Sequence, residues 1–461
     1  MKVKFSLLVV AVCLLMFILI RRNSLKDDVD PKILEARKRF KHVVVLMLEN
    51  QSFDKVLGFV EGVGELSGKE YNVNSQGRKI YVKKGADPLR DNLIMDPPHK
   101  HKEMLSQLYG PEGRINGQDP EGMGYLITNF PHGNPPGGLD YEQIFMAGYD
   151  SEHMQLPAIT TLAQNFVVCN RYYASMPGPT GPNRLFVHFA TSGGHLSSAY
   201  NEDDFRTPEE MLSIFELMDQ AGKNLTWKIY HDDSDTILKN QYRDTSGLFH
   251  DMPDKMSTAM TIPYVRKNRQ NIRSLNEDFF QDIQKNNLAH YSFLTPKILE
   301  NSQHPGVANM IPGDELVRKV FNALKSREDI WQNTLFIITY DEAGGYFDSV
   351  PPKGEVPAPE SYVGKSWPPS YGQEFDFKVL GTRVPTILVS PHFTKQKNST
   401  QLEHSSIPKT LSLLWGLKSK KRADGHLSER AKFAHHLFEN VSFLPEYRED
   451  EVLIPKNTYI N

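Results

Sequence analysis

Cysteine is scarce in this sequence, and neither sign of charge dominates it. Only Cys13 and Cys169 occur among the 461 residues, and Cys13 lies within an apolar N-terminal run. We therefore expect neither a disulfide inside a folded domain nor a cysteine-rich metal module. The 53 Lys and Arg residues nearly balance the 56 Asp and Glu residues, for a formal charge of −3. The basic excess of nucleic-acid-binding proteins is absent, so we expect no nucleic-acid partner.

Several common catalytic motifs are also missing. The sequence has no G-x-S-x-G nucleophile elbow, no H-E-x-x-H zinc motif and no Walker loop. Residues 62–69 contain glycines and a lysine, as phosphate-binding loops do, but their spacing fits neither phosphate-loop pattern, and we predict a surface turn. Any catalytic site must therefore be built from residues that are distant in the sequence.

The N-terminal residues are predicted to direct the chain into the secretory pathway. Residues 5–20 form an unbroken run of apolar and small side chains that ends at Arg21 and Arg22. No small-residue cleavage pattern follows, which favours an uncleaved signal anchor over residues 1–22; a cleaved signal peptide is the alternative. Residues 23–40 are charged and are predicted to form a stalk, with one domain over residues 41–461. We expect a membrane-anchored lumenal or extracellular protein, or a secreted one if the segment is cleaved. Glycosylation sequons at Asn224, Asn398 and Asn440 agree with this, and a fourth, at Asn50, lies in the proposed site and is predicted to be unmodified.

The scaffold is predicted to alternate strands and helices. Residues 42–48 (HVVVLML) and 335–340 (LFIITY) are continuous apolar runs, which are typical of strands buried on both faces. Residues 384–390 form a third such run, and residues 315–326 place apolar side chains on one helical stripe. Weaker strand patterns occur at 227–230 and 291–294. This order predicts a mostly parallel sheet covered by helices in one large α/β domain.

Acidic and amide side chains follow two of these strands. Glu49 and Asn50 come directly after the first strand, and Asp341 and Glu342 directly after the second. In open parallel sheets, ligands bind beyond the carboxyl ends of the strands. Oxygen ligands of this kind suit one divalent ion, whose identity the sequence leaves open. Taken singly, each cluster is better explained as a helix cap or as a loop whose amides it binds.

A loop rich in proline and glycine contains a candidate nucleophile. The segment Met176-Pro-Gly-Pro-Thr180-Gly-Pro-Asn183-Arg184 restricts the backbone around Thr180, and Arg184 could bind a phosphate. A threonine hydroxyl is a weak nucleophile unless a metal or a base lowers its pKa, which the predicted ion could do. The alternative is an ordinary stiffened connection. Histidines in polar loops, among them His99, His250, His304 and His404, could bind phosphoryl oxygens or protonate a leaving group.

Six of these motifs occur together in an order that resembles the phosphoesterase family, which contains the non-specific, phosphatidylcholine-preferring phospholipases C and related acid phosphatases. The resemblance runs from about residue 40 to about residue 416. The motifs are Glu49-Asn-Gln-Ser-Phe-Asp54, Asp96-Pro-Pro-His99, Pro179-Thr-Gly-Pro-Asn-Arg184, Tyr340-Asp-Glu-Ala-Gly-Gly345, Arg383-Val-Pro-Thr-Ile-Leu-Val-Ser-Pro391 and Glu403-His-Ser-Ser-Ile-Pro408.

The resemblance implies a fold, a site and a reaction. The fold would be a three-layer αβα arrangement like that of alkaline phosphatase. Thr180 would be the nucleophile and form a phosphothreonine, while His99, His304 and His250 would assist catalysis. Asn183, Arg184 and His404 would contact the substrate or support the site. The implied metal ligands are Glu49, Asn50, Thr180, Asp341 and Glu342.

The implied function is a metal-dependent phospholipase C that releases diacylglycerol and a phosphorylated headgroup, so its partners would be a phospholipid and, through the N-terminal segment, a membrane. Two departures from the family pattern bear on this function. Gly181 stands where many members have His or Gln, and Ala343 stands where the pattern has His. The alternatives are an acid phosphatase acting on small phosphomonoesters and a catalytically weakened ectodomain that binds a lipid or a partner.

Overall fold

The computed structural model describes residues 29–90, 96–111, 120, 122–127, 140–198, 211–231, 262–359, 375–449 and 451–459. Its strands are β1 (His42–Leu48), β2 (Tyr71–Val73), β3 (Lys79–Tyr81), β4 (Lys83–Lys84), β5 (Ala147–Gly148), β6 (Val167–Cys169), β7 (Tyr172–Tyr173), β8 (Trp227–Tyr230), β9 (Ile272–Arg273), β10 (Tyr291–Leu294), β11 (Thr334–Tyr340), β12 (Ile387–Val389), β13 (Gln396–Asn398) and β14 (Leu402–Glu403). Its α-helices are α2 (Pro31–Arg39), α3 (Phe53–Leu57), α4 (His101–Tyr109), α5 (Tyr141–Phe145), α6 (Pro157–Asn165), α7 (Thr180–Phe189), α8 (Ile214–Gln220), α11 (Pro263–Lys267), α12 (Phe280–Gln284), α13 (Met310–Lys325), α14 (Glu328–Trp331), α15 (Ser406–Trp415) and α16 (Glu429–Phe433).

The central sheet has eight strands in the order β13-β6-β12-β11-β1-β10-β8-β9. Its neighbouring strands are parallel except for β12, which runs antiparallel to both β11 and β6. All seven residues of β11 and six of the seven in β1 are buried. Burial on both faces explains why these two strands are apolar along their whole length. The expected mostly parallel sheet is confirmed.

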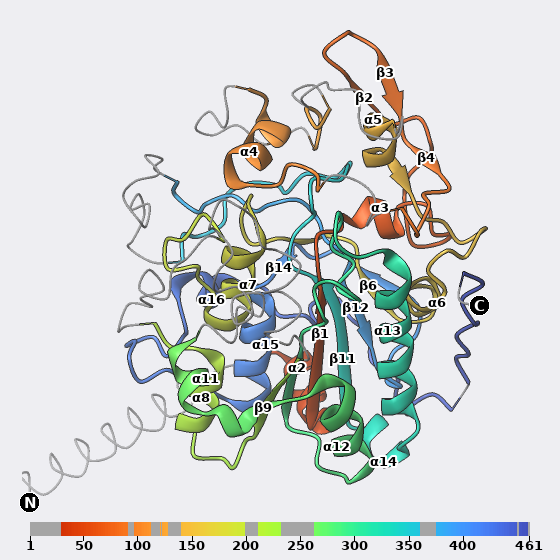
Figure 1. The fold of residues 1–461 in the computed structure, drawn as a ribbon. Helices are drawn as coiled ribbons and strands as arrows, with labels where there is room; N and C mark the ends of the chain where they lie inside the picture. Colours follow the sequence, from red (N-terminus) through yellow and green to blue (C-terminus); the bar gives the residue numbers. More distant parts are fainter. Residues whose placement is uncertain are drawn as a thin grey trace, which may run out of the picture.

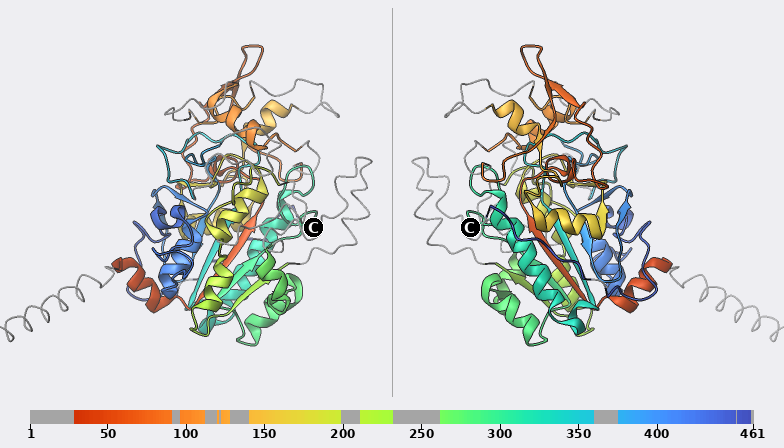
Figure 2. Two further views of the ribbon diagram at one scale, coloured as in Figure 1. Left: turned by 90° about the vertical axis from the view of Figure 1, so that its left-hand side faces the viewer. Right: turned by 90° about the vertical axis from the view of Figure 1, so that its right-hand side faces the viewer.

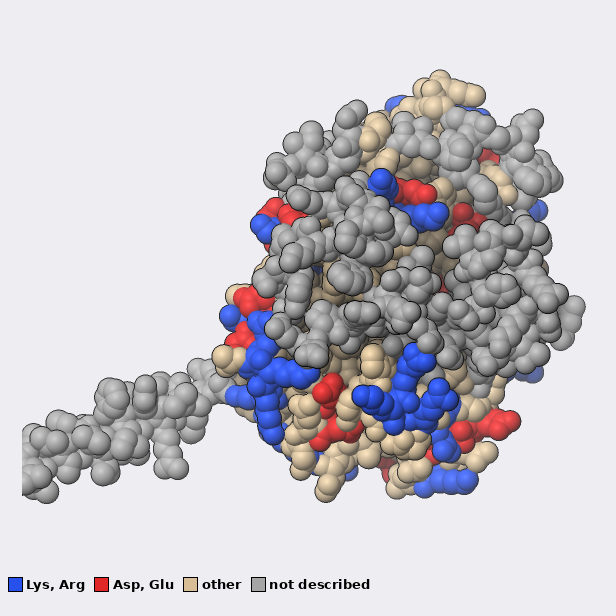
Figure 3. Space-filling view, turned by 60° about the vertical axis from the view of Figure 1, so that its left-hand side comes forward, with Lys and Arg blue, Asp and Glu red and all other residues tan. Residues whose placement is uncertain are grey.

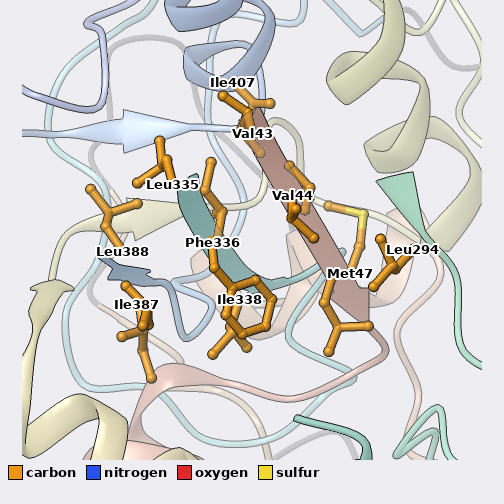
Figure 4. Close-up of a cluster of buried hydrophobic side chains, with 14 of the residues drawn as sticks. Val43, Val44, Met47, Leu294, Leu335, Phe336, Ile338, Ile387, Leu388 and Ile407 are labelled. Carbon is orange, nitrogen blue, oxygen red and sulfur yellow. The ribbon is translucent and has the colours of Figure 1, made fainter. Parts of the chain in front are cut away.

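Helices cover both faces of this sheet (Figures 1 and 2). Helix α13 packs against α6, α12 and α14 on one face, and α15 packs against α2, α7 and α16 on the other. The side chains between the layers form the main core, part of which is drawn in Figure 4 around Val44, Phe336 and Leu388. The three-layer αβα arrangement expected from the sequence is therefore confirmed.

Two element boundaries differ from the sequence prediction for local reasons. Helix α13 begins at Met310, five residues earlier than expected, because the side chain of Asn309 accepts a hydrogen bond from the amide of Ile311 at 3.1 Å and caps it. Strand β12 begins only at Ile387. Pro385 precedes it and has no amide hydrogen to donate to a sheet ladder.

The segment predicted as a stalk is partly folded. Residues 31–39 form helix α2, in which Ile33 and Ala36 are fully buried. The guanidinium of Arg37 donates to the carbonyl oxygen of Leu413 at 2.6 Å, which joins α2 to α15. The expectation of a stalk up to residue 40 is thus corrected. Ile33, Ala36 and Phe40 have helical spacing, and this short apolar stripe was the missed signal.

A second, smaller hydrophobic cluster lies beyond the carboxyl end of β1. It joins Leu108 of α4 and Phe145 of α5 to Ile80 of β3 and to Phe347, which follows β11. Figures 1 and 2 show α4, α5, β2 and β3 together at the top of the molecule, at the end of the sheet where β1 finishes. These elements therefore surround the edge of the sheet where the candidate site was expected.

Two expectations fall on parts of the chain that are not described. The apolar run at residues 5–20 lies outside the described residues, and so does His250. Among the helices that are described, none combines the length and the apolar character needed to cross a bilayer.

Candidate active site

The pairing of β1 with β11 brings the two acidic clusters together. Leu48 at the end of β1 is paired with Tyr340 at the end of β11, so Glu49 and Asp341 leave the sheet side by side. The amide of Asn50 donates to Asp341 Oδ1 at 3.1 Å, and the amide of Glu342 donates to the same oxygen at 2.8 Å. All four side chains are buried. The structure thus gathers the four residues that sequence reasoning had assigned to one metal ion.

Arg184 lies between two of these carboxylates. Its Nε donates to Asp341 Oδ2 and its Nη2 to Glu49 Oε1, each at 2.9 Å, and its side chain is 1% exposed. The sequence had suggested that Arg184 contacts substrate; the structure places these donors on the protein's own acids. Glu49 and Asp341 share this guanidinium, whereas Glu342 lies beside His99, so three buried carboxylates face two basic side chains.

Thr180 is the first residue of α7, one turn before Arg184 on the same helix. Residues four apart lie on one helix face, so the contacts of Arg184 bring this face of α7 to the acidic cluster. Thr180 is partly exposed, whereas the loop before it is buried from Tyr172 to Pro179. Helix N-termini favour anions, so the start of this ten-residue helix would suit an anionic group beside Thr180.

Asn183 fixes the loop that precedes Thr180. Its side-chain oxygen accepts from the amide of Met176 at 3.1 Å, and its amide nitrogen donates to the carbonyls of Gly178 and Pro179 at 3.0 and 3.2 Å. Asn183 is fully buried. The structure therefore places this predicted substrate-binding residue behind the loop, where it holds the backbone conformation.

His99 and His304 both face Asn50. Their Nε2 atoms lie 3.5 and 3.1 Å from the Asn50 side-chain nitrogen. Each Nδ1 lies 2.7 Å from a backbone carbonyl oxygen, that of Pro97 or Pro305, so Nδ1 is protonated in both rings and Nε2 faces the site. His99 Nε2 also lies 3.5 Å from Glu342 Oε1.

The two imidazoles have opposite charge preferences. Burial alone would lower the pKa of His99, but Glu342 and then Asp96 raise it to about 9. Burial is the main cause that lowers the pKa of His304, and the positive field of His99 adds to it. Groups whose pKa values are driven apart can serve as acid and as neutral hydrogen-bonding partner in one site.

His404 supports the acidic cluster from behind. It is fully buried, and its Nε2 lies 2.6 Å from the backbone carbonyl oxygen of Asp341, to which it donates. Its Nδ1 lies 3.3 Å from the hydroxyl of Tyr172. The predicted substrate-binding role of this histidine is untested, and its described contacts are with the protein.

Two buried oxygens of the cluster are of the kind that a divalent ion takes as ligands. Asn50 Oδ1 is buried and has no hydrogen-bond partner among the described residues, and the same holds for Glu342 Oε1. Such oxygens, next to further carboxylates of the cluster, are suited to Mg²⁺, Mn²⁺ or Ca²⁺. Ligand atoms of Asp96, His99 and His304 also lie within 4.8 Å of one another, which adds nitrogen donors nearby.

Sequence reasoning assigned no role to a second buried ion cluster beside the site. Arg383 Nη2 contacts Asp54 Oδ1, and Arg383 Nε contacts Asp348 Oδ1, both at 2.8 Å and with all three side chains buried. Burial raises the pKa of Asp348 to about 7, against the opposing field of Arg383. This triad joins the segments that follow β1 and β11. The sequence could have indicated this triad, because Asp54 and Asp348 lie only a few residues beyond Glu49 and Glu342.

The sequence analysis also assigned no role to Gly344. It has a φ of 62°, and a Cβ placed there would lie 2.1 Å from the carbonyl oxygen of Asn50. Only glycine permits this contact between the two loops.

Comparisons with known proteins agree with the order of these motifs. A sequence model of the phosphoesterase family matches residues 40–418. Non-specific phospholipase C3 of Arabidopsis thaliana is 31% identical over 82% of this chain and 70% of its own length. The non-hemolytic phospholipase C of Pseudomonas aeruginosa is 24% identical over 90% of this chain and 60% of its own.

Solved structures that match this chain share less sequence identity with it than these relatives do. A protein in the alkaline phosphatase superfamily from Vibrio parahaemolyticus gives a TM-score of 0.33 at 12% identity, over 58% of this chain and 62% of that one. The PsFucS1 sulfatase from Pseudoalteromonas sp. gives a TM-score of 0.37 at 10% identity, over 84% and 72% of the two chains.

Proposed function

Because this chain belongs to the phosphoesterase family of hydrolases, we propose that it hydrolyses phospholipids to diacylglycerol and a phosphorylated headgroup, as a phospholipase C does. The observation that carries this proposal is the contact of Arg184 with Glu49 and Asp341. Through it, a helix that begins at a partly exposed threonine is fixed to a buried acidic cluster. Relatives named as phospholipases C, about 30% identical over most of the chain, support the substrate class.

In the proposed reaction Thr180 is the nucleophile. Thr180 reacts as the alkoxide, after its hydroxyl proton has passed to solvent: Oγ1 forms a bond to phosphorus while the bond from phosphorus to the glycerol oxygen breaks, and the departing oxygen takes a proton from His99. Water then attacks phosphorus and gives one proton back to His99, while the bond from phosphorus to Oγ1 breaks; this releases the phosphorylated headgroup and leaves the Thr180 alkoxide for the next cycle. His304 would contact a phosphoryl oxygen throughout. A positive His99 beside Glu342 supports its role as the acid.

We also propose that Glu49, Asn50, Thr180, Asp341 and Glu342 hold one divalent ion, with Arg184 balancing part of the acidic charge. When bound, such an ion lowers the pKa of a coordinated hydroxyl and offsets phosphoryl charge. The three buried carboxylates brought together at the ends of β1 and β11, and the buried Asn50 Oδ1, support this assignment.

A cavity beside the loop that leads to Thr180 could take part of a diester substrate. A cavity of about 220 Å³ is lined by Pro179, which precedes Thr180, and by Lys100, His101 and Leu196, among others. A phosphodiester needs room for a second substituent on phosphorus, and this cavity offers it. A phosphatase that acts on small phosphomonoesters would use the same nucleophile, so the two functions differ in substrate and not in chemistry.

The test is hydrolysis of phosphatidylcholine and of an aryl phosphomonoester by the full chain, with and without a chelator. We expect chelator-sensitive diacylglycerol release that falls at least a hundredfold in Thr180→Ala and largely returns in Thr180→Ser. Thr458→Ala, at an exposed position, serves as the control and should behave as the wild type.

Monoester hydrolysis alone would reassign the protein as a phosphatase. Inactivity toward both substrates, from a folded protein, would favour the weakened ectodomain. The feature behind that alternative is Ala343, which is 1% exposed where the family pattern has histidine. Wild-type rates in Thr180→Ala would exclude the covalent mechanism.

The N-terminal run supports one more proposal, that the protein enters the secretory pathway. The mass of the mature protein would show whether residues 1–22 are retained as an anchor or removed.

A further inference from the structure

The hairpin formed by β2 and β3 differs in charge from the rest of the chain. Residues 69–84 contain five basic residues and one acidic residue, in a chain whose formal charge is −3. The basic residues are Lys69, Arg78, Lys79, Lys83 and Lys84. Arg78 is paired with Glu142 at 2.9 Å and Lys84 with Glu152 at 3.6 Å. Two of the five basic residues are thus paired with acids, and Lys69, Lys79 and Lys83 carry the remaining positive charge of the segment.

One face of this hairpin also exposes aromatic rings. Tyr71 and Tyr81 are directly opposite each other across the two strands, and their ring centroids are 5.5 Å apart. They are 44% and 47% exposed. Lys79 Nζ lies 4.1 Å from the centre of the Tyr71 ring. We call Tyr71, Lys79 and Tyr81 the hairpin face. Exposed tyrosines beside lysines are the composition found at the interface of a bilayer with water.

The opposite face of the hairpin holds it on the protein. Ile80 and Val82 are buried in the hydrophobic cluster that includes Leu108 of α4 and Phe347. Beyond Val82 the chain continues into β4, which pairs with β5. The strict alternation of buried and exposed residues directs one set of side chains into that cluster and the other outward.

The hairpin lies on the side of the domain that carries the candidate site. Phe347 follows Asp341 and Glu342 closely in the sequence, and it belongs to the cluster that anchors the hairpin. In Figures 1 and 2 the β2–β3 hairpin projects from the top of the molecule, beyond the end of β1 that leads into Glu49. Helix α2 precedes β1 at the other end of that strand. The hairpin and α2 therefore lie toward opposite ends of β1.

We propose that the hairpin face docks on the surface of a bilayer that contains anionic phospholipid, with Tyr71 and Tyr81 at the headgroup level and the nearby lysines over the anionic lipids. Its role in presenting lipid to the site rests on the proposed function. The docking itself rests on the exposed aromatic pair and the local charge. Juxtamembrane lysines interact favourably with anionic leaflets, and tyrosine places an apolar ring and a polar hydroxyl at the interface.

The first test measures insertion without any reference to catalysis. Tyr81→Trp in the full chain is mixed with vesicles of phosphatidylcholine and phosphatidylglycerol that carry brominated acyl chains. We expect its fluorescence to be quenched beyond that of the wild type, which already contains four Trp residues. Leu453→Trp, at a position 69% exposed and remote in the sequence, should add no quenching. Equal quenching of Tyr81→Trp and wild type would overturn the proposal.

The second test separates the local charge of the hairpin from basic charge in general. Lys and Arg also gather on the lower half of the face in Figure 3. Lys418, Lys420 and Lys421 are exposed after α15 and give a control with the same change in charge. Replacing Lys79, Lys83 and Lys84 by Gln should weaken binding to the anionic vesicles by about a hundredfold. The triple Gln variant at 418, 420 and 421 should bind as the wild type does. Equal losses in the two triple variants would overturn the assignment to the hairpin.

The third test connects docking to turnover. Tyr71→Ser/Tyr81→Ser should lower hydrolysis of vesicle phosphatidylcholine in anionic vesicles by about tenfold, and leave hydrolysis of a short-chain phosphatidylcholine monomer unchanged. Equal losses on both substrates would mean that the hairpin affects the site and not docking. If the wild type hydrolyses neither lipid, the proposed function fails, while the quenching experiment still decides the docking proposal.

Discussion

The guanidinium of Arg184 bridges Asp341 and Glu49, with 2.9 Å from Nε to Asp341 Oδ2 and 2.9 Å from Nη2 to Glu49 Oε1. One side chain on α7 thereby fixes the ends of two central strands to the helix that begins at Thr180. Buried ion pairs contribute little net stability when complete, but removing one partner leaves a costly buried charge.

Replacing this arginine should therefore be strongly destabilising. We expect Arg184→Met to lower the free energy of unfolding by about 3–5 kcal/mol, measured by urea denaturation in the presence of a chelator. Mn²⁺ should restore part of that loss, because a cation can compensate the same carboxylates. Arg273→Met breaks an exposed pair with Asp278 and should cost at most about 1 kcal/mol. Equal losses in the two variants would contradict the bridging role of Arg184.

Asn183 should act by positioning the nucleophile loop. Asn183→Ala removes three hydrogen bonds around Met176–Pro179, so we expect kcat to fall at least tenfold while KM and bound metal change little. Asn183→Asp keeps the acceptor and should recover part of kcat. Asn165→Ala, which removes one helix-end hydrogen bond, is the control. A change in KM alone would instead assign Asn183 to substrate binding.

Asp314 should make stability depend on pH. It lies in α13, is 1% exposed, and accepts from the amides of Ala158 and Ile159 at the start of α6. Burial raises its pKa to about 7, although these two amides oppose the shift. The folded state then retains a proton that the unfolded chain releases near pH 4, so stability falls as the pH rises from about 4 to 7.

The measurement is the free energy of unfolding across this interval for the wild type and Asp314→Asn. In Asp314→Asn the free energy of unfolding should fall less steeply as the pH rises. The difference in slope should reach up to about 1.4 kcal/mol per pH unit, the value for one proton. Identical slopes would show that the carboxyl titrates normally in the folded protein.

The glycosylation sequons should differ in use if the chain enters the secretory pathway. Asn398 is fully buried and its side-chain nitrogen donates to the carbonyl of Leu437 at 3.1 Å, so we expect no glycan there. Asn224 and Asn440 are exposed. Glycopeptide mass spectrometry of protein from a secreting eukaryotic host should find sugar at Asn224 or Asn440 and none at Asn398. A glycan on Asn398 would contradict the burial.

The sequence by itself determined the scaffold and the family. The apolar runs at residues 42–48 and 335–340 specify buried strands because a strand covered on both faces must be apolar throughout. The order of the motifs from Glu49 to His404 identified the phosphoesterase family, and the match over residues 40–418 confirms it.

Only the tertiary structure decided what these residues contact. Arg184 and Asn183 were interpreted as substrate-binding residues because a basic and an amide side chain next to a nucleophile have that chemistry. The structure shows contacts of Arg184 with Glu49, Asp341 and the carbonyl of Leu48, and contacts of Asn183 with its own loop, and their substrate-binding role stays a prediction. The two acids that Arg184 contacts lie more than a hundred residues from it in the sequence, and no local pattern specifies them. Charge compensation in a buried site depends on which chain segments meet, and that is set by the pairing of β1 with β11 and by the packing of α7 beside them.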